Sequence, residues 1–509
     1  MNGGTVDDSL DEISSPPSSS GIPGLDDILS GGFPAHQLHL VEGSPGTGKT
    51  TLALQFLLAG RELGEAVLYV TLSETRRELL AVARSHGWSL DGIHIQEMEP
   101  LEEGLAPEQQ VTLFHPSELE LSETTSRVLK MVEEIQPSRV VFDSLSEMRL
   151  LAQSSLRYRR QILGLKQFFS GRQITVLLLD DLTGPGDDQQ LQSIAHGVVH
   201  LEQLATEYGA ERRRLRVLKM RATAFRGGLH DFVIRRGGMD VFPRLIAAEH
   251  YTEFEEQEAL SGIASLDRLL GGGLPYGSST LLVGPAGTGK SSVSMSFCVA
   301  AAVRGERSAL FLFDETEAII KIRARKLGMP LEPHIDAGLI TVRQIEPAEL
   351  SPGEFAASVR RAVEGKDGRG LPAKLVLLDS LNGYLNSMSE EKQLTSQLHE
   401  LFKYTNQQGV LMLVTLSQSS AGGGAAVRSP IDSTYLADNV LMFRNFESYG
   451  QLRRAVAATK KRSGAHELTL RELRMDSRGI LIGEPLHDFQ GVLTGVPTYH
   501  GKGDPRNQP

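Results

Sequence analysis

The chain has 509 residues, a formal net charge of −11 and one cysteine, Cys298. The acidic balance argues against a nucleic-acid-binding protein, because such proteins usually carry a basic surface. A single cysteine excludes an intrachain disulfide and a cysteine-based metal site. The sequence has neither an apolar run of the roughly 18 residues that cross a membrane nor a basic-then-apolar secretory signal at its start. We therefore expect a cytoplasmic protein with no membrane contact.

The two halves of the chain share residues in register. Gly284 lies 241 residues after Gly43 (284 − 43 = 241), and Lys460 follows Lys219 at the same interval. A repeat this long indicates two whole domains, each large enough for one α/β core. The predicted organisation is a disordered Ser/Pro-rich tail at 1–20, a first domain at 21–248, a linker at 249–261, a second domain at 262–490 and a C-terminal tail at 491–509.

Each predicted domain carries a P-loop near its start, at 43–50 and at 284–291. Both fit G-x-x-x-x-G-K-[ST] and follow an apolar run typical of a buried strand. The glycines let backbone N–H groups curl around phosphates, the Lys meets the β/γ-phosphates, and the final hydroxyl ligates Mg²⁺. The predicted ATP-binding residues are Gly43, Ser44, Pro45, Gly46, Thr47, Gly48, Lys49, Thr50 and Thr51 in the first domain, and Gly284, Pro285, Ala286, Gly287, Thr288, Gly289, Lys290, Ser291 and Ser292 in the second.

Further along each half, buried-strand patterns end in acidic residues. The runs 139–143 and 375–379 finish in Asp143 and Asp379, the pattern of a Walker B strand. Aspartate at the carboxyl end of a parallel strand can hold the Mg²⁺ shell, so the predicted metal ligands are Thr50, Asp143, Ser291 and Asp379. Continuous apolar strands alternating with helices indicate a parallel sheet with helices on both faces. The predicted fold is therefore α/β, with two tandem RecA-like P-loop NTPase domains.

Near the end of each domain, a strand-like run finishes in Lys-x-Arg. These elements are Lys219 with Arg221 and Lys460 with Arg462. In RecA-like rings a neighbouring subunit supplies a cation to the γ-phosphate, and such a finger stabilises the charge that develops during transfer. The alternative is a solvated basic strand end. The identical spacing in both halves favours the catalytic interpretation.

The paired Gly-x-x-x-Leu-Asp-x-x-Leu-x-Gly-Gly openings at 21–32 and 262–273, the two P-loops, the acidic pockets at 73–75 and 314–316 and the two Lys-x-Arg elements together resemble the KaiC family. The segment 483–495 resembles the non-cyanobacterial branch of that family. The resemblance implies double-domain ATPases that assemble as stacked hexameric rings and bind ATP with Mg²⁺ between subunits. It also implies a second domain that transfers phosphate to a Ser or Thr of the adjacent subunit. The implied partners are five further copies of the chain and a signalling protein that the sequence does not identify.

The acidic pockets depart from the family pattern of two adjacent Glu residues. The first domain has Ser73 before Glu74, and serine cannot take a proton from water at neutral pH. The second has Asp314 before Glu315, which keeps the carboxylate on a shorter side chain. The implied catalytic residues are Glu74, Asp314, Glu315, Lys219, Arg221, Lys460 and Arg462. We expect the second site to be the more competent.

The phosphoacceptors implied by the resemblance lie shortly before Asp438. Alignment on this residue gives Thr434 and Tyr435, and a shift of one residue gives Ser433 and Thr434. Hydroxyls at these positions are also common as turn or helix-capping residues. The sequence thus predicts a Mg²⁺-dependent ATPase and serine/threonine autokinase that acts in signalling or timing. The alternatives are a nucleotide-gated scaffold with little hydrolysis and, less favoured, a recombinase-like DNA motor.

Overall fold

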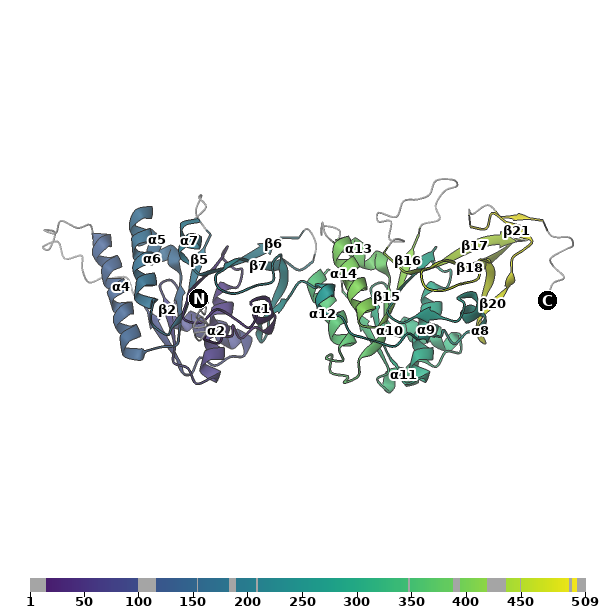
Figure 1. The fold of residues 1–509 in the computed structure, drawn as a ribbon, viewed down its shortest axis with the longest axis horizontal. Helices are drawn as coiled ribbons and strands as arrows, with labels where there is room; N and C mark the ends of the chain where they lie inside the picture. Colours follow the sequence, from purple (N-terminus) through teal and green to yellow (C-terminus); the bar gives the residue numbers. More distant parts are fainter. Residues whose placement is uncertain are drawn as a thin grey trace, which may run out of the picture. The chain divides into compact units, whose positions relative to one another are not determined.

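The structure is a computed structural model that describes residues 15–98, 116–152, 154–182, 189–206, 209–346, 348–387, 394–418, 436–448, 450–493 and 497–500. The chain divides into two compact units, Met1–Arg244 and Leu245–Pro509 (Figure 1). Each unit contains a nine-stranded sheet.

The sheet of the first unit has the strand order β3-β2-β4-β5-β1-β6-β7-β8-β9. Its strands are β1 Leu38–Gly43, β2 Val67–Thr71, β3 Ile93–Glu97, β4 Arg139–Asp143, β5 Thr175–Asp181, β6 Gly197–Leu204, β7 Arg212–Met220, β8 His230–Arg235 and β9 Gly238–Phe242. In this spatial order, the six neighbouring strands β3, β2, β4, β5, β1 and β6 pair in parallel. Strands β7, β8 and β9 then extend the sheet in antiparallel pairing. Every residue of β1, β2 and β4 is buried, as expected for strands covered on both faces.

Helices cover both faces of this sheet. They are α1 Pro23–Ile28, α2 Lys49–Glu62, α3 Arg76–His86, α4 Pro116–Ile135, α5 Leu145–Ala152, α6 Ser155–Phe169 and α7 Gln189–Ile194. Val41 of β1 packs in one apolar cluster with Phe56 of α2, and the preceding Leu40 packs in a second cluster with Ile162 of α6. Because successive strand residues point to opposite faces, the two clusters are the two sides of one sheet.

The second unit repeats the arrangement, with the order β14-β13-β15-β16-β12-β17-β18-β19-β20. Its strands are β10 Glu258–Ala259, β11 Leu274–Pro275, β12 Ser279–Gly284, β13 Arg307–Leu312, β14 Ile340–Gln344, β15 Ala373–Asp379, β16 Leu411–Ser417, β17 Asn439–Ser448, β18 Gln451–Lys461, β19 Arg471–Asp476, β20 Gly479–Pro485, β21 Phe489–Gln490 and β22 Thr498–Tyr499. Its helices are η2 Ala247–Glu249, α8 Ala264–Leu269, α9 Lys290–Val303, α10 Glu317–Lys326, α11 Leu331–Asp336, α12 Pro352–Val363, α13 Leu381–Ser387 and α14 Leu394–Gln407. The predicted α/β fold with two tandem domains is confirmed.

The domain edges differ from the predicted ones. Ser18 pairs with Phe33 through both backbone groups, and Ser20 is fully buried, so the first domain includes residues before 21. The segment 249–261, predicted as a linker, packs on the second domain. The ring of Phe254 packs directly on Gly277 and Gly409. A Cβ atom added at these glycines would come within 2.3 Å and 2.6 Å of the ring, respectively. The predicted C-terminal tail likewise contributes a buried residue, Val492, beside Phe446.

The parallel strands place the predicted site residues together. The carboxyl ends of adjacent parallel strands meet at one edge of a sheet, and in open α/β sheets ligands bind there. In the first domain the P-loop follows β1, Glu74 follows β2, and Asp143 ends β4. Within the described residues, no helix is long and apolar enough to cross a membrane.

Candidate functional site

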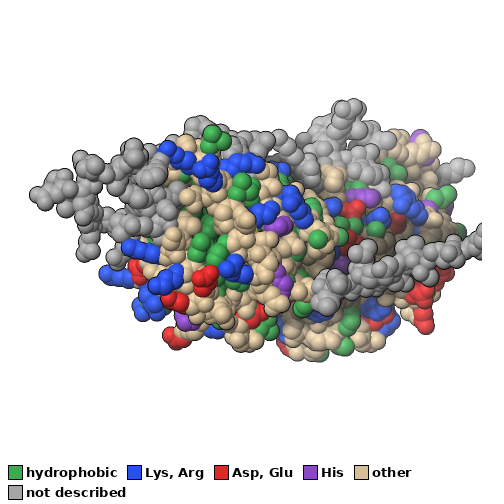
Figure 2. All heavy atoms as spheres, turned by 60° about the vertical axis from the view of Figure 1, so that its left-hand side comes forward, with side chains coloured by type: hydrophobic (Ala, Val, Ile, Leu, Met, Phe, Trp, Pro, Cys, Tyr) green, Lys and Arg blue, Asp and Glu red, His purple; other side chains and the backbone are tan. Residues whose placement is uncertain are grey.

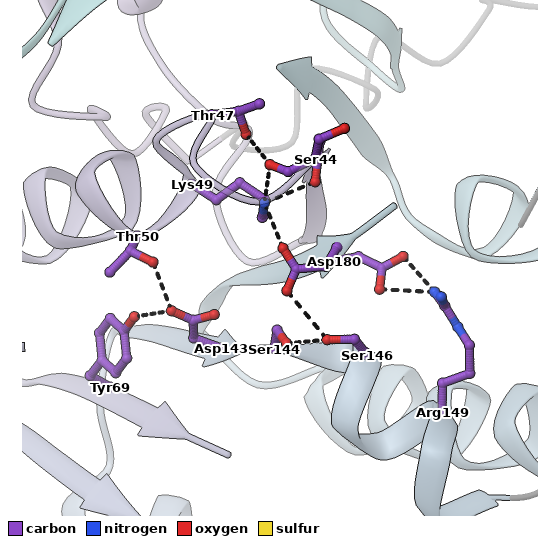
Figure 3. Close-up of polar contacts among 12 residues, drawn as sticks. Ser44, Thr47, Lys49, Thr50, Tyr69, Asp143, Ser144, Ser146, Arg149 and Asp180 are labelled. Atoms are coloured by element: carbon purple, nitrogen blue, oxygen red, sulfur yellow. Dashed lines mark hydrogen bonds and ion pairs between the residues drawn. The ribbon is translucent and has the colours of Figure 1, made fainter. Parts of the chain in front are cut away.

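The P-loop lysine of the first domain is held within its own loop (Figure 3). Gly48 adopts a left-handed conformation, with φ of 102°, and lies immediately before α2. The buried Lys49 Nζ donates hydrogen bonds to the carbonyl oxygens of Gly43 at 2.8 Å and Ser44 at 2.9 Å. This geometry leaves the backbone amides at the start of α2 directed toward the loop, where they favour an anion.

The second P-loop has the same conformation. Gly289 has φ of 103° before α9, and Lys290 Nζ donates to the carbonyls of Gly284 and Pro285, both at 2.8 Å. Burial lowers the pKa of Lys290 to about 8. A pocket of about 510 Å³ opens beside this loop, within the usual size range of small-molecule sites. Its lining residues are Gly287, Gly289, Lys290, Ser291, Ser292, Glu315, Ile319, Ile322, Arg323, Lys326, Leu327 and Met475.

In both domains the predicted metal ligands lie within hydrogen-bonding distance of each other. Thr50 Oγ1 donates to Asp143 Oδ2 at 3.1 Å, and Ser291 hydrogen-bonds Asp379. Burial raises the pKa of each aspartate, and the hydrogen bonds oppose that shift. A hydroxyl beside a carboxylate is the kind of oxygen pair that Mg²⁺ prefers at P-loop sites. The residues present therefore fit a bound magnesium nucleotide.

Each Walker B aspartate accepts a further hydrogen bond that the sequence pattern did not indicate. Tyr69 Oη on β2 donates to Asp143, and Thr415 Oγ1 on β16 donates to Asp379. In the first sheet β2 lies on one side of β4, the strand that ends in Asp143. In the second sheet β16 lies on the opposite side of β15, the strand that ends in Asp379. The two donors therefore do not occupy matching positions of the repeat. A hydroxyl within an apolar strand gives no sequence signal of this role.

Glu74, the predicted base of the first domain, lies in the loop after β2. Thr71 fixes this loop, because its Oγ1 accepts from the Glu74 amide at 2.9 Å and donates to the Glu74 carbonyl at 2.6 Å. Burial, followed by the charges of Asp143, Glu78 and Asp181, raises the pKa of Glu74 to about 7. Among the described residues, Glu74 Oε2 has no hydrogen-bond partner. This carboxyl group therefore titrates near neutrality, as a general base requires.

The corresponding pocket of the second domain is arranged differently. Glu315 forms an ion pair with Arg323 of α10. Asp314 accepts a hydrogen bond from Ser380 Oγ at 2.5 Å. Each predicted carboxylate is therefore bound to a neighbouring side chain of its own domain. No sequence motif indicates this arginine, although it lies eight residues after Glu315, on α10.

A further carboxylate enters the first site from β5. Asp181 Oδ1 lies 2.7 Å from Lys49 Nζ. The preceding Asp180 is buried and pairs with Arg149 of α5 at 2.6 Å (Figure 3). No motif predicted from the sequence includes either aspartate, and both lie at the end of the apolar strand β5. The signal available was the acidic pair at its end.

The Lys-x-Arg elements lie away from the P-loops of their own domains. Lys219 Nζ on β7 donates to the carbonyls of Gln192 and Ala195, both at 2.7 Å, and Arg221 is exposed. In the second domain, Lys460 Nζ donates to the Ala437 carbonyl at 2.7 Å. The side chain of Arg462 is 58% exposed and contacts Asp438 at 3.0 Å.

The strand register shows which sheet edge these elements occupy. Met220 pairs with Gly197, and Gly197 pairs with His39 near the start of β1. From His39 to Gly43 the strand rises about 13 Å. The Lys-x-Arg element of the first domain is thus at the opposite edge of the sheet from its own P-loop. The pairings of Lys460 with Val440 and of Thr280 with Asn439 give the same arrangement in the second domain.

The predicted phosphoacceptors Ser433, Thr434 and Tyr435 lie outside the described residues. On the face drawn in Figure 2, Lys and Arg side chains form several separate groups with acidic and uncharged surface between them. The net charge of −11 also gives no support to the DNA-motor alternative.

Comparisons with known proteins give a consistent result. The family model described as "ATPase: KaiC" matches the chain twice, at residues 18–246 and 259–487. The chain is 27% identical over 489 residues to the circadian clock oscillator protein KaiC of Acaryochloris marina, covering 94% of this chain and 90% of the relative. It is also 27% identical to the circadian clock protein KaiC3 of Synechocystis over 492 residues, covering 94% of both chains.

Proposed function

The chain belongs to the KaiC family of ATPases, and we propose that it binds ATP with Mg²⁺ at both P-loops and hydrolyses it in a hexameric double ring. The observation that carries this proposal is the repeated geometry of loop lysine, hydroxyl and strand-terminal aspartate at one sheet edge of each domain. Lys49 and Lys290 would hold the terminal phosphates, and the backbone amides after Gly48 and Gly289 would surround them.

The metal pair and the acidic loop supply the chemistry. Thr50 with Asp143, and Ser291 with Asp379, would hold Mg²⁺, which neutralises charge on the phosphates when bound. Glu74 and Glu315 stand at the ends of β2 and β13, next to these pairs, and would orient an attacking water and take its proton. Glu74 already has the raised pKa that suits this role.

The position of the Lys-x-Arg elements supports assembly into a ring. Because Arg221 and Arg462 lie at the sheet edge opposite their own P-loops, neither can meet a phosphate bound in its own domain. We propose that each serves the nucleotide of an adjacent copy of the chain. Exposed arginines at this edge are suited to that contact, and a hexamer is the arrangement that the family resemblance implies.

We further propose that the second domain is the more active and is an autokinase. Ser73 leaves the first pocket with one carboxylate, whereas the second has Asp314 and Glu315. Candidate acceptors are Ser433, Thr434 and Tyr435, which precede Asp438. The relatives are named as circadian clock proteins, which supports a role in signalling or timing that is read by a partner protein.

The alternative function is a scaffold that binds ATP to assemble and hydrolyses it little. Two observations favour this alternative for the first domain: the missing carboxylate at Ser73 and the ion pair between Lys49 and Asp181. The ion pair between Glu315 and Arg323 extends the same argument to the second domain, unless nucleotide binding releases it.

Single-site variants separate these functions. Turnover of Mg-ATP is measured for Lys49→Ala, for Lys290→Ala and for the double variant, with phosphopeptide mass spectrometry on each sample. The proposal expects most turnover, and all phosphate within 433–435, to disappear with Lys290→Ala. If the parent protein forms an oligomer when ATP is added but hydrolyses almost none of it, the scaffold function is supported in place of the ATPase. Turnover lost mainly with Lys49→Ala would reverse the ranking of the domains.

A further inference from the structure

In the described structure, Lys49 donates to three acceptors. An ammonium group has three protons. The partners of Lys49 Nζ are the carbonyls of Gly43 and Ser44 and the carboxylate of Asp181 at 2.7 Å. The lysine side chain is only 7% exposed and that of Asp181 is 27% exposed. A phosphate that engages Lys49 therefore has to compete with a carboxylate built into the same domain.

The second domain has no such carboxylate. The register pairs Gly43 with Asp181 and Gly284 with Ser417, so serine stands where the first domain has aspartate. Within the described residues Lys290 forms no ion pair, and its Nζ donates to two loop carbonyls. The chain therefore contains a natural comparison, since the same loop geometry occurs once with and once without the acidic residue.

Asp181 is fixed in place by the sheet. It ends β5, whose neighbour β1 leads directly into the P-loop. Ser146 Oγ donates to Asp181 Oδ2 at 3.4 Å. Its charge reaches Asp143 and Glu74, because it raises the pKa of both. The negative field is thus concentrated where the P-loop lysine would meet the terminal phosphates.

We propose that Asp181 is a specificity-determining residue that disfavours nucleoside triphosphate relative to diphosphate in the first domain. The γ-phosphate adds negative charge next to Lys49, and a nearby carboxylate opposes it by like-charge repulsion and by competing for the ammonium group. A diphosphate places less charge at this point. The inference rests on the proposed nucleotide site, and it gives the first domain a weaker preference for triphosphate over diphosphate than the second domain has.

The test compares fluorescent ATP and ADP analogues binding to the full chain with Mg²⁺. In the Lys290→Ala background only the first site keeps its P-loop lysine. There, Asp181→Ser should raise the ratio of triphosphate affinity to diphosphate affinity by about tenfold or more. Asp181→Asn, which keeps the shape and removes the charge, should do the same. In the Lys49→Ala background, Ser417→Asp should lower the same ratio at the second site by a similar factor.

The outcomes distinguish this inference from the proposed function. An unchanged ratio in Asp181→Ser overturns it, as does a fall in triphosphate affinity, which would make Asp181 a helper of the bound metal ion. If the first site of the parent binds neither analogue, then triphosphate binding gained in Asp181→Ser supports the inference, and continued absence of binding contradicts it. Failure of the proposed function is a separate result: no nucleotide binding at Lys290 in the Lys49→Ala variant.

Discussion

Glu74 and Glu315 occupy matching positions of the repeat but meet different surroundings. Glu74 is half-buried among other carboxylates, and burial is the main cause that raises its pKa to about 7. Glu315 instead forms an ion pair with Arg323. A carboxyl group with an elevated pKa is suited to proton transfer, and it also makes the folded state less favourable once it ionises. The same residue type therefore carries different consequences for activity and stability in the two domains.

This difference predicts how Glu74→Gln changes stability. Since the folded pKa of Glu74 exceeds the ordinary value of 4.5, the unfolded chain releases the proton first, and stability falls as pH rises from about 4.5 to 7. Gln carries no charge, so the variant should be more stable above pH 7, with a gain that shrinks toward pH 5. After discounting for solvent screening, the gain is on the order of 1 kcal/mol, or about 2–4 °C in Tm.

Thermal melts of the nucleotide-free protein with chelator, at pH 5 and pH 8, provide the measurement. Glu315→Gln is the matched control, and it should not stabilise because it leaves Arg323 without its partner. If Glu74→Gln lowered the stability equally at both pH values, the Glu74 carboxyl group would be stabilising the fold, and its ionisation would not be a cost to the folded state.

At the level of elements, the two Walker B strands receive their orienting hydrogen bond from different neighbours. Strand β2 supplies Tyr69 to Asp143, whereas β16 supplies Thr415 to Asp379. The sheet order is the same in both domains, so the difference lies in which flanking strand carries the hydroxyl. Residues that orient a metal ligand are worth about 10–100-fold in metal affinity or activity.

We therefore expect Tyr69→Phe to raise the Mg²⁺ concentration needed for half-maximal nucleotide binding by about tenfold at the first site only. Thr415→Val should have the same effect at the second site only. Each substitution removes a hydroxyl and keeps the volume, and each is the control for the other when measured in the Lys290→Ala and Lys49→Ala backgrounds. If Tyr69→Phe changed the Mg²⁺ requirement equally at both sites, the substitution would be lowering overall stability, and Tyr69 would not act by orienting Asp143.

At the level of the whole molecule, the proposed active site is shared between copies of the chain. The register places Arg462 at the sheet edge opposite Lys290, so a complete second-domain site needs the arginine of a neighbour. Loss of such a finger costs about 10³-fold or more in other NTPases.

A mixing experiment tests this shared site, with Lys49→Ala in every chain to silence the first domain. Arg462→Ala and Lys290→Ala should each be nearly inactive alone. Mixed before assembly, they should recover part of the parent turnover, because the Lys290→Ala copy donates Arg462 to an intact site on its neighbour. Recovery should be absent from a mixture of Arg462→Ala with Lys290→Ala/Arg462→Ala. No recovery in the first mixture would place Arg462 outside the active site.

The two domains and their α/β fold could be predicted from the sequence, as could the positions of both P-loops and of the two aspartates proposed to bind Mg²⁺. These features are local: a glycine pattern, a lysine and a strand-terminal acid follow one another at short intervals, and the 241-residue repeat supplies a second copy of each. The Lys-x-Arg elements also followed from the repeat, although their sheet edge became clear only from the strand register.

The chemical differences between the two sites depend on which strands and side chains the fold brings together. Asp181 reaches Lys49 because β5 lies beside β1, although the two residues are far apart in sequence. Tyr69 and Thr415 orient the aspartates through strand pairing in the same way. No sequence interval encodes these contacts, since each depends on which strands become neighbours. The shift of the Glu74 pKa likewise arises from burial and nearby charges, which exist only once the sheet has formed.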